Sequence, residues 1–401
     1  MEKWKFLLLG VTGDLASKKI LPGISQFAQI NEEKVKISFI GYSRSKPEEQ
    51  NIIKILNEGS TTGKHFLSSI SFLQGQYDDP AFFGTFIDSL DEDETGVIYM
   101  AVPPNVFLDF LKTSCPYSKK KIHILVEKPF GRDIQEAQEI LDLVKACTLG
   151  DKVHFTDHYY FKSQSILEKG DLLNLKPLQS KEITRIEVSA IEKLGIEGRV
   201  GYFENVGSLK DMLPHLLSLT TLALDVQKGV DYSDFFQNYK VKDVRWGQYK
   251  SYLKDGHLSE SKTETYFKVE AETTSGVEII FESGKKLGQK KTQIKIFYSD
   301  ESELIWRIDP EKNLDLISHE QVLTLNLDRN KKLDHTNLFE NLLNGIVQNF
   351  VQPEEILLQW RLYQGIINFK NSKYLKPDIY KDSHYPVQAF VPRKKSGSEK
   401  K

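Results

Sequence analysis

The chain has 401 residues, with 54 Lys and Arg against 56 Asp and Glu and a formal net charge of −2. This balance argues against a nucleic-acid-binding protein, whose surface would carry a strong basic excess. With 39% hydrophobic residues and this length, the chain can bury the cores of two domains. Two cysteines are too few for a disulfide framework or a cysteine-rich metal site. The apolar run Phe6 to Val11 is too short to cross a bilayer and no cleavage-site pattern follows it, so we expect a cytoplasmic protein without membrane contact.

Strands alternate with amphipathic helices in the first third of the chain. Four mostly apolar runs predict buried strands, at Trp4–Gly10, Val35–Gly41, Gly96–Val102 and Lys121–Val126. A helix is expected over Asp133–Thr148, with Asp133 as its N-cap and Glu136 completing a capping box. Repeated strand–helix units predict an α/β, Rossmann-type N-terminal domain over residues 1–155.

After about residue 155 the pattern changes to longer strands, several of which alternate apolar and polar residues. Strands are expected at Ile183–Ile191, Thr263–Ala271, Val277–Phe281, Thr292–Tyr298 and Leu304–Ile308. Helices are expected at Val206–Leu224, Leu338–Phe350 and Glu354–Asn368. Residues 156–390 are therefore predicted to form an α+β domain with a large, mainly antiparallel open sheet. Residues 391–401 are predicted to be a disordered basic tail.

The turn after the first strand has the features of a phosphate-binding loop. In the segment Gly10 to Leu15, glycines permit a tight turn and a close approach of backbone N–H groups to a pyrophosphate. A helix that begins near Asp14 would add a favourable partial charge. The spacing G-x-x-G is weaker than the common dinucleotide fingerprint, and an ordinary strand–helix turn is the alternative.

The end of the second strand carries a signal for cofactor choice. An acidic residue at this point binds the ribose hydroxyl in NAD-specific folds, but no Asp or Glu occupies Gly41 to Ser45. Arg44 beside Ser43 instead suits the additional phosphate of NADP, because a guanidinium offers fork-shaped donors. A surface arginine in a loop is the alternative.

Several ordered blocks of sequence resemble the glucose-6-phosphate dehydrogenase family. They are Gly10–Ile20, Phe39–Ser45, Tyr99–Pro104, Val126–Asp133, Asp157–Lys162, Glu197–Glu204 and Gly284–Leu287. The resemblance extends from about residue 5 to about residue 375. It implies NADP-dependent oxidation of a sugar phosphate, most simply glucose 6-phosphate, at C1 to a lactone. The cofactor-binding residues that it implies are Gly10, Thr12, Gly13, Asp14, Leu15, Ser43, Arg44, Tyr99, Pro103, Pro104, Lys128 and Pro129.

The resemblance also implies a set of substrate-binding residues. They are Lys128, His158, Tyr159, Lys162, Glu192, Asp211 and Lys285. Positions 158 and 162 are four apart, which would place them on one face of a helical turn. Lys128 follows a buried strand and precedes Pro129, so it is expected at the carboxyl edge of the sheet, where open α/β sheets bind ligands. Solvent-exposed or purely structural roles for these residues are the alternatives.

By resemblance, His215 is the catalytic base and Asp157 orients it. An imidazole accepts a proton near neutral pH, and a carboxylate on its other nitrogen fixes the tautomer. Here the chain departs from the family pattern, because three residues rather than four separate Asp211 from His215. Pro214 directly precedes the histidine and would suit the first turn of a helix, so this helix is expected to begin later than in the family.

Other functions stay open at this point. Glu282 stands where the family often carries a basic residue, which would fit a different or modified sugar phosphate. The shifted histidine would also fit a catalytically impaired homologue that binds only nucleotide. The glucose–fructose oxidoreductase type shares the Rossmann domain and the Glu-Lys-Pro turn, but the Asp157-His158-Tyr159 block favours the first family. A homodimer that associates through the large sheet is expected by resemblance.

Overall fold

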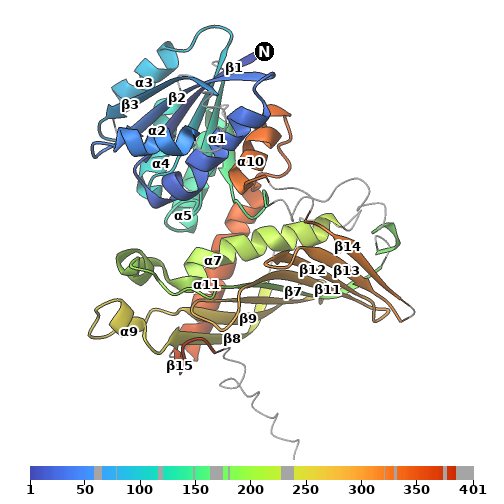
Figure 1. Cartoon of the computed structure of the whole chain (residues 1–401). Helices are drawn as coiled ribbons and strands as arrows, with labels where there is room; N and C mark the ends of the chain where they lie inside the picture. Colours follow the sequence, from blue (N-terminus) through green and yellow to red (C-terminus); the bar gives the residue numbers. More distant parts are fainter. Residues whose placement is uncertain are drawn as a thin grey trace, which may run out of the picture. The chain divides into compact units, whose positions relative to one another are not determined.

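The computed structural model describes residues 1–57, 66–77, 79–115, 121–147, 150–162, 175–178, 181–226, 239–319, 321–328, 332–373 and 377–384. The chain forms two compact units (Figure 1). Unit 1 comprises residues 1–172 and 327–361, and unit 2 comprises residues 173–326 and 362–401. None of the described helices combines the length and apolarity that a membrane-spanning segment requires.

Unit 1 contains a six-stranded parallel sheet, as predicted for the N-terminal domain. The strands are β1 (Glu2–Leu9), β2 (Val35–Ser43), β3 (Leu67–Gln74), β4 (Glu94–Met100), β5 (Ile122–Glu127) and β6 (Val153–Thr156). Their order in the sheet is β3-β2-β1-β4-β5-β6. The order reverses between β1 and β4, and ligands of doubly wound sheets bind at the carboxyl ends of strands at such a point.

Helices cover this sheet in two layers. One layer contains α1 (Leu21–Ile30), α2 (Glu49–Asn57) and α10 (Asp334–Leu343); the other contains α3 (Pro80–Asp88), α4 (Phe107–Ser114) and α5 (Ile134–Ala146). Short helical turns precede α1 and α4, at Ala16–Ile20 and Pro104–Val106. The four predicted strands and the helix over α5 are confirmed. The strands β3 and β6 were not predicted: β3 is largely exposed along its length and β6 has only four residues, so neither forms a long apolar run.

The chain returns to unit 1 at residues 327–361, after the strands of unit 2. The predicted division at residue 155 does not include this return. Helix α10 packs on α1, and the side chain of Thr336 donates to the carbonyl of Gly23 over 3.1 Å. A Cβ atom on Gly23 would lie 2.4 Å from that of His335, so only glycine permits this approach of the two helices. Helix α11 (Pro353–Ser372) begins in unit 1, and its last residues belong to unit 2.

Unit 2 contains the predicted large sheet, with nine strands that are mostly antiparallel. They are β7 (Ile183–Ile191), β8 (Tyr239–Tyr249), β9 (Tyr266–Thr273), β10 (Glu278–Gly284), β11 (Lys291–Tyr298), β12 (Glu303–Asp309), β13 (Asn313–Ile317), β14 (Val322–Asn326) and β15 (Asp378–Tyr380). Their order is β14-β13-β12-β11-β7-β10-β9-β8-β15, with parallel pairing only for β7 with β10 and β8 with β15. The α+β prediction is therefore confirmed.

One face of this sheet carries the long helix α7 (Val200–Asp225), as Figure 1 shows. The residues of the central strands that point toward it are buried, for example Val188, Phe281 and Ile294. Alternate residues on the other face are charged or polar and partly exposed, for example Glu187, Lys268 and Lys295. The short elements Lys176–Leu178 and α9 (Tyr252–Asp255) complete unit 2.

Several predicted details of helices are corrected by the structure. Helix α10 ends at Leu343 and does not reach Phe350, because Gly345 adopts a positive φ of 66°. Asp133 caps α5 by accepting from the N–H of Glu136. The Glu136 carboxylate, however, accepts from the N–H of Arg132 over 2.6 Å rather than from the cap residue, so the capping box is incomplete.

The two cysteines are joined to each other, which a composition argument against a disulfide framework did not anticipate. Cys115 follows α4 and Cys147 follows α5, and the disulfide links the carboxyl ends of these helices. The predicted basic tail at residues 391–401 lies outside the described residues.

A pair of histidines lies at the edge of the parallel sheet. The Nδ1 atom of His123 on β5 is 3.0 Å from the Nε2 atom of His154 on β6, and the ring of Phe350 packs on His154. Burial, with the nearby ammonium groups of Lys152 and Lys121, lowers the pKa of His123 from 6.5 to about 4. Burial, with the neighbouring His123, lowers the pKa of His154 to about 3. Both rings are therefore neutral in the folded protein at neutral pH.

This pair predicts that unit 1 loses stability in mild acid. Unfolded histidine takes up a proton near pH 6.5, whereas the folded pair resists protonation until about pH 4, so the unfolded state binds more protons between these values. We expect the free energy of unfolding to fall by on the order of 3 kcal/mol per histidine between pH 6.5 and 4. Urea denaturation at a series of pH values measures this slope.

The matched variants are His154→Gln on β6, which removes one titrating ring, and Ile124→Val on the adjacent buried strand β5. His154→Gln should flatten the pH dependence, whereas Ile124→Val should lower stability by about 1 kcal/mol at every pH. An unchanged slope in His154→Gln would contradict the assignment.

Candidate active site

The predicted phosphate loop lies at the carboxyl end of β1, at the reversal of the strand order. Gly10 has a φ of 82°, and a Cβ atom there would lie 2.1 Å from the carbonyl oxygen of Ala101, which follows β4. The N–H groups of Gly10 and Val11 both donate to the carbonyl of Tyr42. These contacts join the ends of β1, β2 and β4 and leave no room for a side chain at Gly10.

The residues that follow are open to solvent, as a phosphate cradle requires. Thr12, Gly13 and Asp14 are exposed, and the helical backbone begins at Asp14, as predicted. The N–H of Gly13 donates to the carbonyl of Gly10, which closes the turn. Leu15 immediately precedes the helical turn that leads into α1. The amino-terminal end of this helical segment therefore presents exposed backbone beside the sheet edge, where it favours a negative charge.

The loop after β2 holds the predicted selectivity residues. Ser43 is buried and its hydroxyl donates to the carbonyl of Ser45, while Arg44 is exposed. The guanidinium of Arg44 lies 5.3 Å from the ring centre of Tyr77, and the Gln74 side chain donates to the Arg44 carbonyl. Tyr77 was not among the predicted residues, because it follows β3, the strand that the apolar pattern did not reveal. The aromatic ring supports the guanidinium on the solvent side of the sheet edge.

The ends of β4 and β5 lie at this same edge. Pro103 and Pro104 begin the short helical turn that leads into α4. Lys128 and Pro129 follow β5 in a turn, are partly exposed, and are joined by a cis peptide bond. The side chain of Tyr99, in contrast, is completely buried and donates to the carboxylate of Glu127. The Tyr99 side chain is therefore not accessible for the predicted contact with a cofactor.

Residues 157–162 form a turn after β6 rather than the predicted helical turn. Asp157 is buried and its carboxylate accepts from the N–H of Tyr159 over 2.9 Å, an arrangement typical of an Asx turn. His158 is partly exposed and its ring packs on that of Tyr159. The ammonium group of Lys162 lies 4.2 Å from the centre of the Tyr159 ring. The turn therefore gathers the three predicted phosphate-binding side chains without a helix.

In unit 2, helix α7 carries Asp211 and His215. Its backbone is interrupted at Gly207, with φ 67° and ψ 173°, and the segment resumes at Ser208. The carbonyl of Glu264 accepts from the N–H of Ser208, and its carboxylate accepts from the N–H of Leu209. Residues 211 and 215 are four apart in the resumed helix and share one face. Tyr202 donates to the carboxylate of Asp211, and His215 is buried.

The predicted helix over Val206–Leu224 is present as the segment that resumes after Gly207, but the suggestion that Pro214 lies in its first turn is wrong. Pro214 is the seventh residue after Gly207 and lies inside the helix, where it cannot donate the usual backbone hydrogen bond. The kink at Gly207 lets the helix restart, and the Glu264 side chain accepts a backbone N–H at the amino-terminal end of the restarted helix. Neither Gly207 nor Glu264 indicated this start in the sequence. The start of the helix is therefore set upstream of Asp211.

Lys285 and Glu192 are brought together in unit 2. Lys285 is buried and its ammonium group pairs with the Glu192 carboxylate, while it also lies 5.3 Å from the ring centre of Phe203 on α7. Glu282 points to the opposite face of the sheet, where its carboxylate accepts from Tyr266 over 2.6 Å and it lines a small hollow with Lys268. The sequence argument that Glu282 alters the sugar pocket is therefore not supported by its position.

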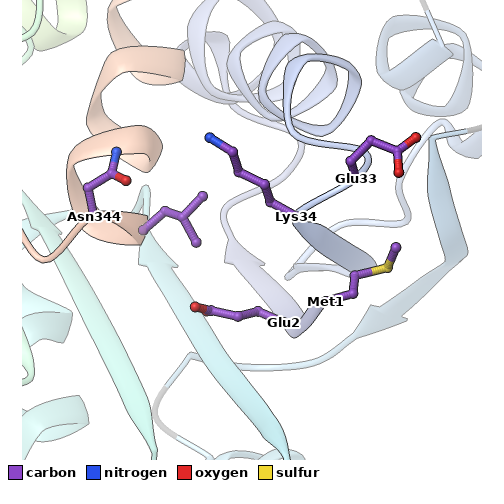
Figure 2. Close-up of a pocket in the computed structure, with 6 residues that line it drawn as sticks. Met1, Glu2, Glu33, Lys34 and Asn344 are labelled. Carbon is purple, nitrogen blue, oxygen red and sulfur yellow. The ribbon is translucent and has the colours of Figure 1, made fainter.

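A larger cavity, of about 400 Å³, opens in unit 1 at the opposite end of the sheet from the phosphate loop. Figure 2 shows Lys34 in its centre, with Glu33 and Met1 on one side and Asn344 on the other. Glu2, which also lines it, is the first residue of β1, so the cavity lies at the amino-terminal edge of the strands. Ligands of open α/β sheets bind at the carboxyl edge, so the cavity is not a candidate for the cofactor site.

Two family sequence models together match most of the chain. The model described as "Glucose-6-phosphate dehydrogenase, NAD binding domain" matches residues 7–164. The model described as "Glucose-6-phosphate dehydrogenase, C-terminal domain" matches residues 174–397.

Curated relatives match over most of their length. A glucose-6-phosphate 1-dehydrogenase of Hanseniaspora uvarum is 27% identical, over 95% of this chain and 92% of the relative. An enzyme of the same name from Caenorhabditis elegans is 24% identical, over 98% of this chain and 91% of the relative. A chloroplastic enzyme of this name from Solanum tuberosum is 25% identical, over 93% of this chain and 79% of the relative.

Solved structures share the fold of the whole chain. A glucose-6-phosphate dehydrogenase in complex with its substrate glucose-6-phosphate superposes with a TM-score of 0.76 at 23% identity, covering 97% of this chain and 96% of that one. A glucose-6-phosphate 1-dehydrogenase from Mycobacterium avium gives 0.74 at 21% identity with the same coverage. A 3-ketoreductase from Actinomadura kijaniata in complex with NADP gives 0.60 at 14% identity, covering 94% and 99%.

Proposed function

Because the chain belongs to the glucose-6-phosphate dehydrogenase family, we propose that it oxidises glucose 6-phosphate at C1 with NADP as hydride acceptor. The observation that carries the proposal is the carboxyl edge of the unit 1 sheet. The open loop at Gly10, the guanidinium of Arg44 and the Lys128–Pro129 turn all lie along it. Relatives with the name glucose-6-phosphate 1-dehydrogenase match this chain over more than nine-tenths of its length.

The residues of unit 1 fit a nucleotide that carries an extra phosphate. The exposed backbone at Thr12 and Gly13 suits the pyrophosphate, and Asp14 begins the helix that favours its charge. Arg44 is held over Tyr77 and suits the 2′-phosphate of NADP, which a carboxylate in this loop would repel. NADP, when bound, supplies a nicotinamide ring that accepts the hydride from C1.

The proposed binding of the sugar phosphate relies on cations and a phenol. His158, Tyr159 and Lys162 are assigned to the phosphate group, because the turn gathers two nitrogen donors and a hydroxyl. Lys128 is assigned to substrate and cofactor from its place at the sheet edge. Glu192, Asp211 and Lys285 are assigned to the sugar hydroxyls, and the Lys285–Glu192 pair would hold both groups in a defined geometry.

The chemistry requires one proton acceptor. When the hydride leaves C1, the proton of the C1 hydroxyl passes to a base, and the carbonyl of the lactone forms. We assign this role to His215, a buried imidazole on α7, and we assign its orientation to the Asp157 carboxylate. The spacing of Asp211 and His215 places both on one face of the resumed helix, which is compatible with binding and proton transfer on that face.

The direct test of the proposal is the formation of NADPH, followed at 340 nm, with NADP or NAD and a panel of sugar phosphates. We expect turnover with glucose 6-phosphate, and His215→Asn should lower kcat by about 10²- to 10⁴-fold, the usual contribution of a general base. Turnover only with another sugar phosphate would favour the modified-substrate alternative. Tight NADP binding without reduction by any sugar would favour the impaired homologue.

Arg44→Ala should weaken NADP binding much more than NAD binding. Charge-assisted hydrogen bonds to phosphate are worth about 1.5–3 kcal/mol, so the KM for NADP should rise roughly 10- to 100-fold. Lys46→Ala is the matched control, because it removes an exposed cation two residues away in the same loop. Equal effects of Arg44→Ala on NADP and NAD would contradict the assignment.

A homodimer that associates through the open face of the unit 2 sheet completes the proposal. This face alternates both signs of charge across neighbouring strands, including Glu187, Lys268, Glu282 and Lys295, around a hollow of about 80 Å³. Mixed charges can be self-complementary across a two-fold axis.

Sedimentation analysis should show a dimer at micromolar concentration, and Lys268→Glu with Lys295→Glu should dissociate it. The same reversal at the exposed Lys36 of unit 1 should leave the dimer intact. A monomeric wild-type protein would contradict this assembly.

The cytoplasm is the proposed location, on the ordinary charge balance of the chain. Cell fractionation with an antibody against the protein tests it, and recovery with an organelle would contradict it.

A further inference from the structure

Three buried polar side chains lie behind the turn that carries Lys128. Tyr99 comes from β4, Glu127 is the last residue of β5, and His335 lies in the first turn of α10. Their exposed fractions are 0%, 6% and 1%. The Tyr99 hydroxyl contacts the Glu127 carboxylate, and the Nε2 atom of His335 lies 3.0 Å from the Tyr99 oxygen. This cluster lies wholly within unit 1, and the assigned chemistry does not use it.

The direction of the hydrogen bonds follows from the number of protons. Tyr99 has one proton, which it donates to the Glu127 carboxylate, so its oxygen must accept from His335. Burial and the neighbouring Glu127 raise the pKa of the Tyr99 hydroxyl well above its ordinary value, so Tyr99 keeps this proton. His335 therefore carries a hydrogen on Nε2.

The two nitrogen atoms of the His335 ring differ in their surroundings. Its Nδ1 atom is buried and has no hydrogen-bond partner in the part of the chain that the structure describes. A second N–H at this atom would be buried without an acceptor, which is costly. The hydrogen on Nε2 therefore faces Tyr99, and the chain of donors runs from His335 through Tyr99 to Glu127.

The packing of α10 holds His335 in place. The His335 Cβ atom packs against Gly23 of α1 so closely that no larger residue fits at position 23. The neighbouring Thr336 donates to the Gly23 carbonyl. The helix that follows the phosphate loop is thus packed directly against the residue that begins the donor chain. A residue more than 200 positions away in sequence thereby supports the end of β5.

The far side of the Lys128 turn is also anchored by the returning segment of the chain. The indole N–H of Trp360, in the unit 1 part of α11, donates to the carbonyl of Phe130 over 2.9 Å. The N–H of Arg132 donates to the Glu136 carboxylate. Lys128 and Pro129 therefore lie between Glu127, which is held by the donor chain, and Phe130, which is held by Trp360.

We propose that His335, Tyr99 and Glu127 are positioning residues, which hold the Lys128 turn in the geometry that hydride transfer requires. This inference rests on the proposed function, in which Lys128 contacts substrate and cofactor. The side chain of Glu127 is fixed by Tyr99, its backbone leads directly into Lys128, and a misplacement of about 1 Å at a reacting centre can lower the rate about 100-fold.

A double-mutant cycle in the full-length chain tests this coupling. Tyr99→Phe removes the bridging hydroxyl and should lower kcat about 10- to 100-fold, while the Kd for NADP changes less than about threefold. In the Lys128→Ala background, Tyr99→Phe should have almost no further effect on kcat, because both changes act on the same group. Additive losses in the cycle would overturn the proposal.

Two further variants separate positioning from general destabilisation. His335→Leu should lower kcat, whereas His335→Gln, whose amide can donate to Tyr99, should restore most of it. Tyr252→Phe is the matched control, because Tyr252 of unit 2 is also buried and donates to a carboxylate, that of Glu204, over 2.5 Å. It should lower the Tm without a comparable loss of kcat. Equal kcat losses in His335→Leu and His335→Gln would contradict the donor chain.

A measurement that does not depend on turnover keeps this inference separate from the proposed function. ¹⁵N NMR of histidine-labelled protein, with the signal assigned through His335→Gln, should show a hydrogen on Nε2 of His335. An Nε2 atom without a hydrogen would overturn the donor chain whether or not the enzyme acts on a sugar phosphate. If the enzyme turns over only another sugar phosphate, the double-mutant cycle is measured with that substrate. If the cycle and the NMR result still agree with the predictions, only the substrate assignment fails.

Discussion

The close approach of the Gly10 backbone to the carbonyl of Ala101 is the constraint on which the proposed cofactor site depends. A Cβ atom at Gly10 would lie 2.1 Å from that oxygen, so β1 and β4 can meet at the reversal of the sheet only because the residue has no side chain. The same loop takes two backbone hydrogen bonds to Tyr42 at the end of β2. With these three strand ends joined, the exposed turn, the Arg44 loop and the segment after β4 share one edge.

Buried polar contacts then determine how side chains are presented from that edge. Glu127 is held by Tyr99 and His335, and its backbone leads into Lys128. In unit 2, Glu264 accepts hydrogen bonds from the first N–H groups of the resumed helix α7. These bonds fix the start of the helix and therefore the positions of Asp211 and His215 along it. In both units a glutamate that is itself hydrogen-bonded fixes the backbone of the functional segment.

Local pattern was enough to predict the fold class and the main strands. The apolar runs that became β1, β2, β4 and β5 are largely buried, and the alternating run at β7 was predicted with its observed bounds. The strand β3 was missed because most of its residues are exposed, and with it Tyr77, which follows it and supports Arg44. Spacing alone suggested a helical turn at residues 158–162, but the Asp157 side chain accepts from the backbone and favours a turn.

Long-range partners were the part that sequence could not supply. His335 lies in an ordinary amphipathic helix, and its contact with Tyr99 depends on the approach at Gly23, which no local pattern indicates. The start of the α7 segment likewise depends on Glu264, which is more than 50 residues away. Pro214 next to His215 therefore suggested a helix start that tertiary contacts override. The blocks that carry the resemblance identified the family, but these supporting contacts required the three-dimensional structure.

The central claim is that the chain moves a hydride from C1 of glucose 6-phosphate to NADP, and isotope transfer tests it most directly. Glucose 6-phosphate with deuterium at C1 is incubated with the protein and NADP, and the nicotinamide product is examined by mass spectrometry and NMR. The account predicts NADPH that carries one deuterium at C4 of the nicotinamide, together with one equivalent of lactone or its hydrolysis product. NADPH without deuterium, or no NADPH although the cofactor binds, would contradict it.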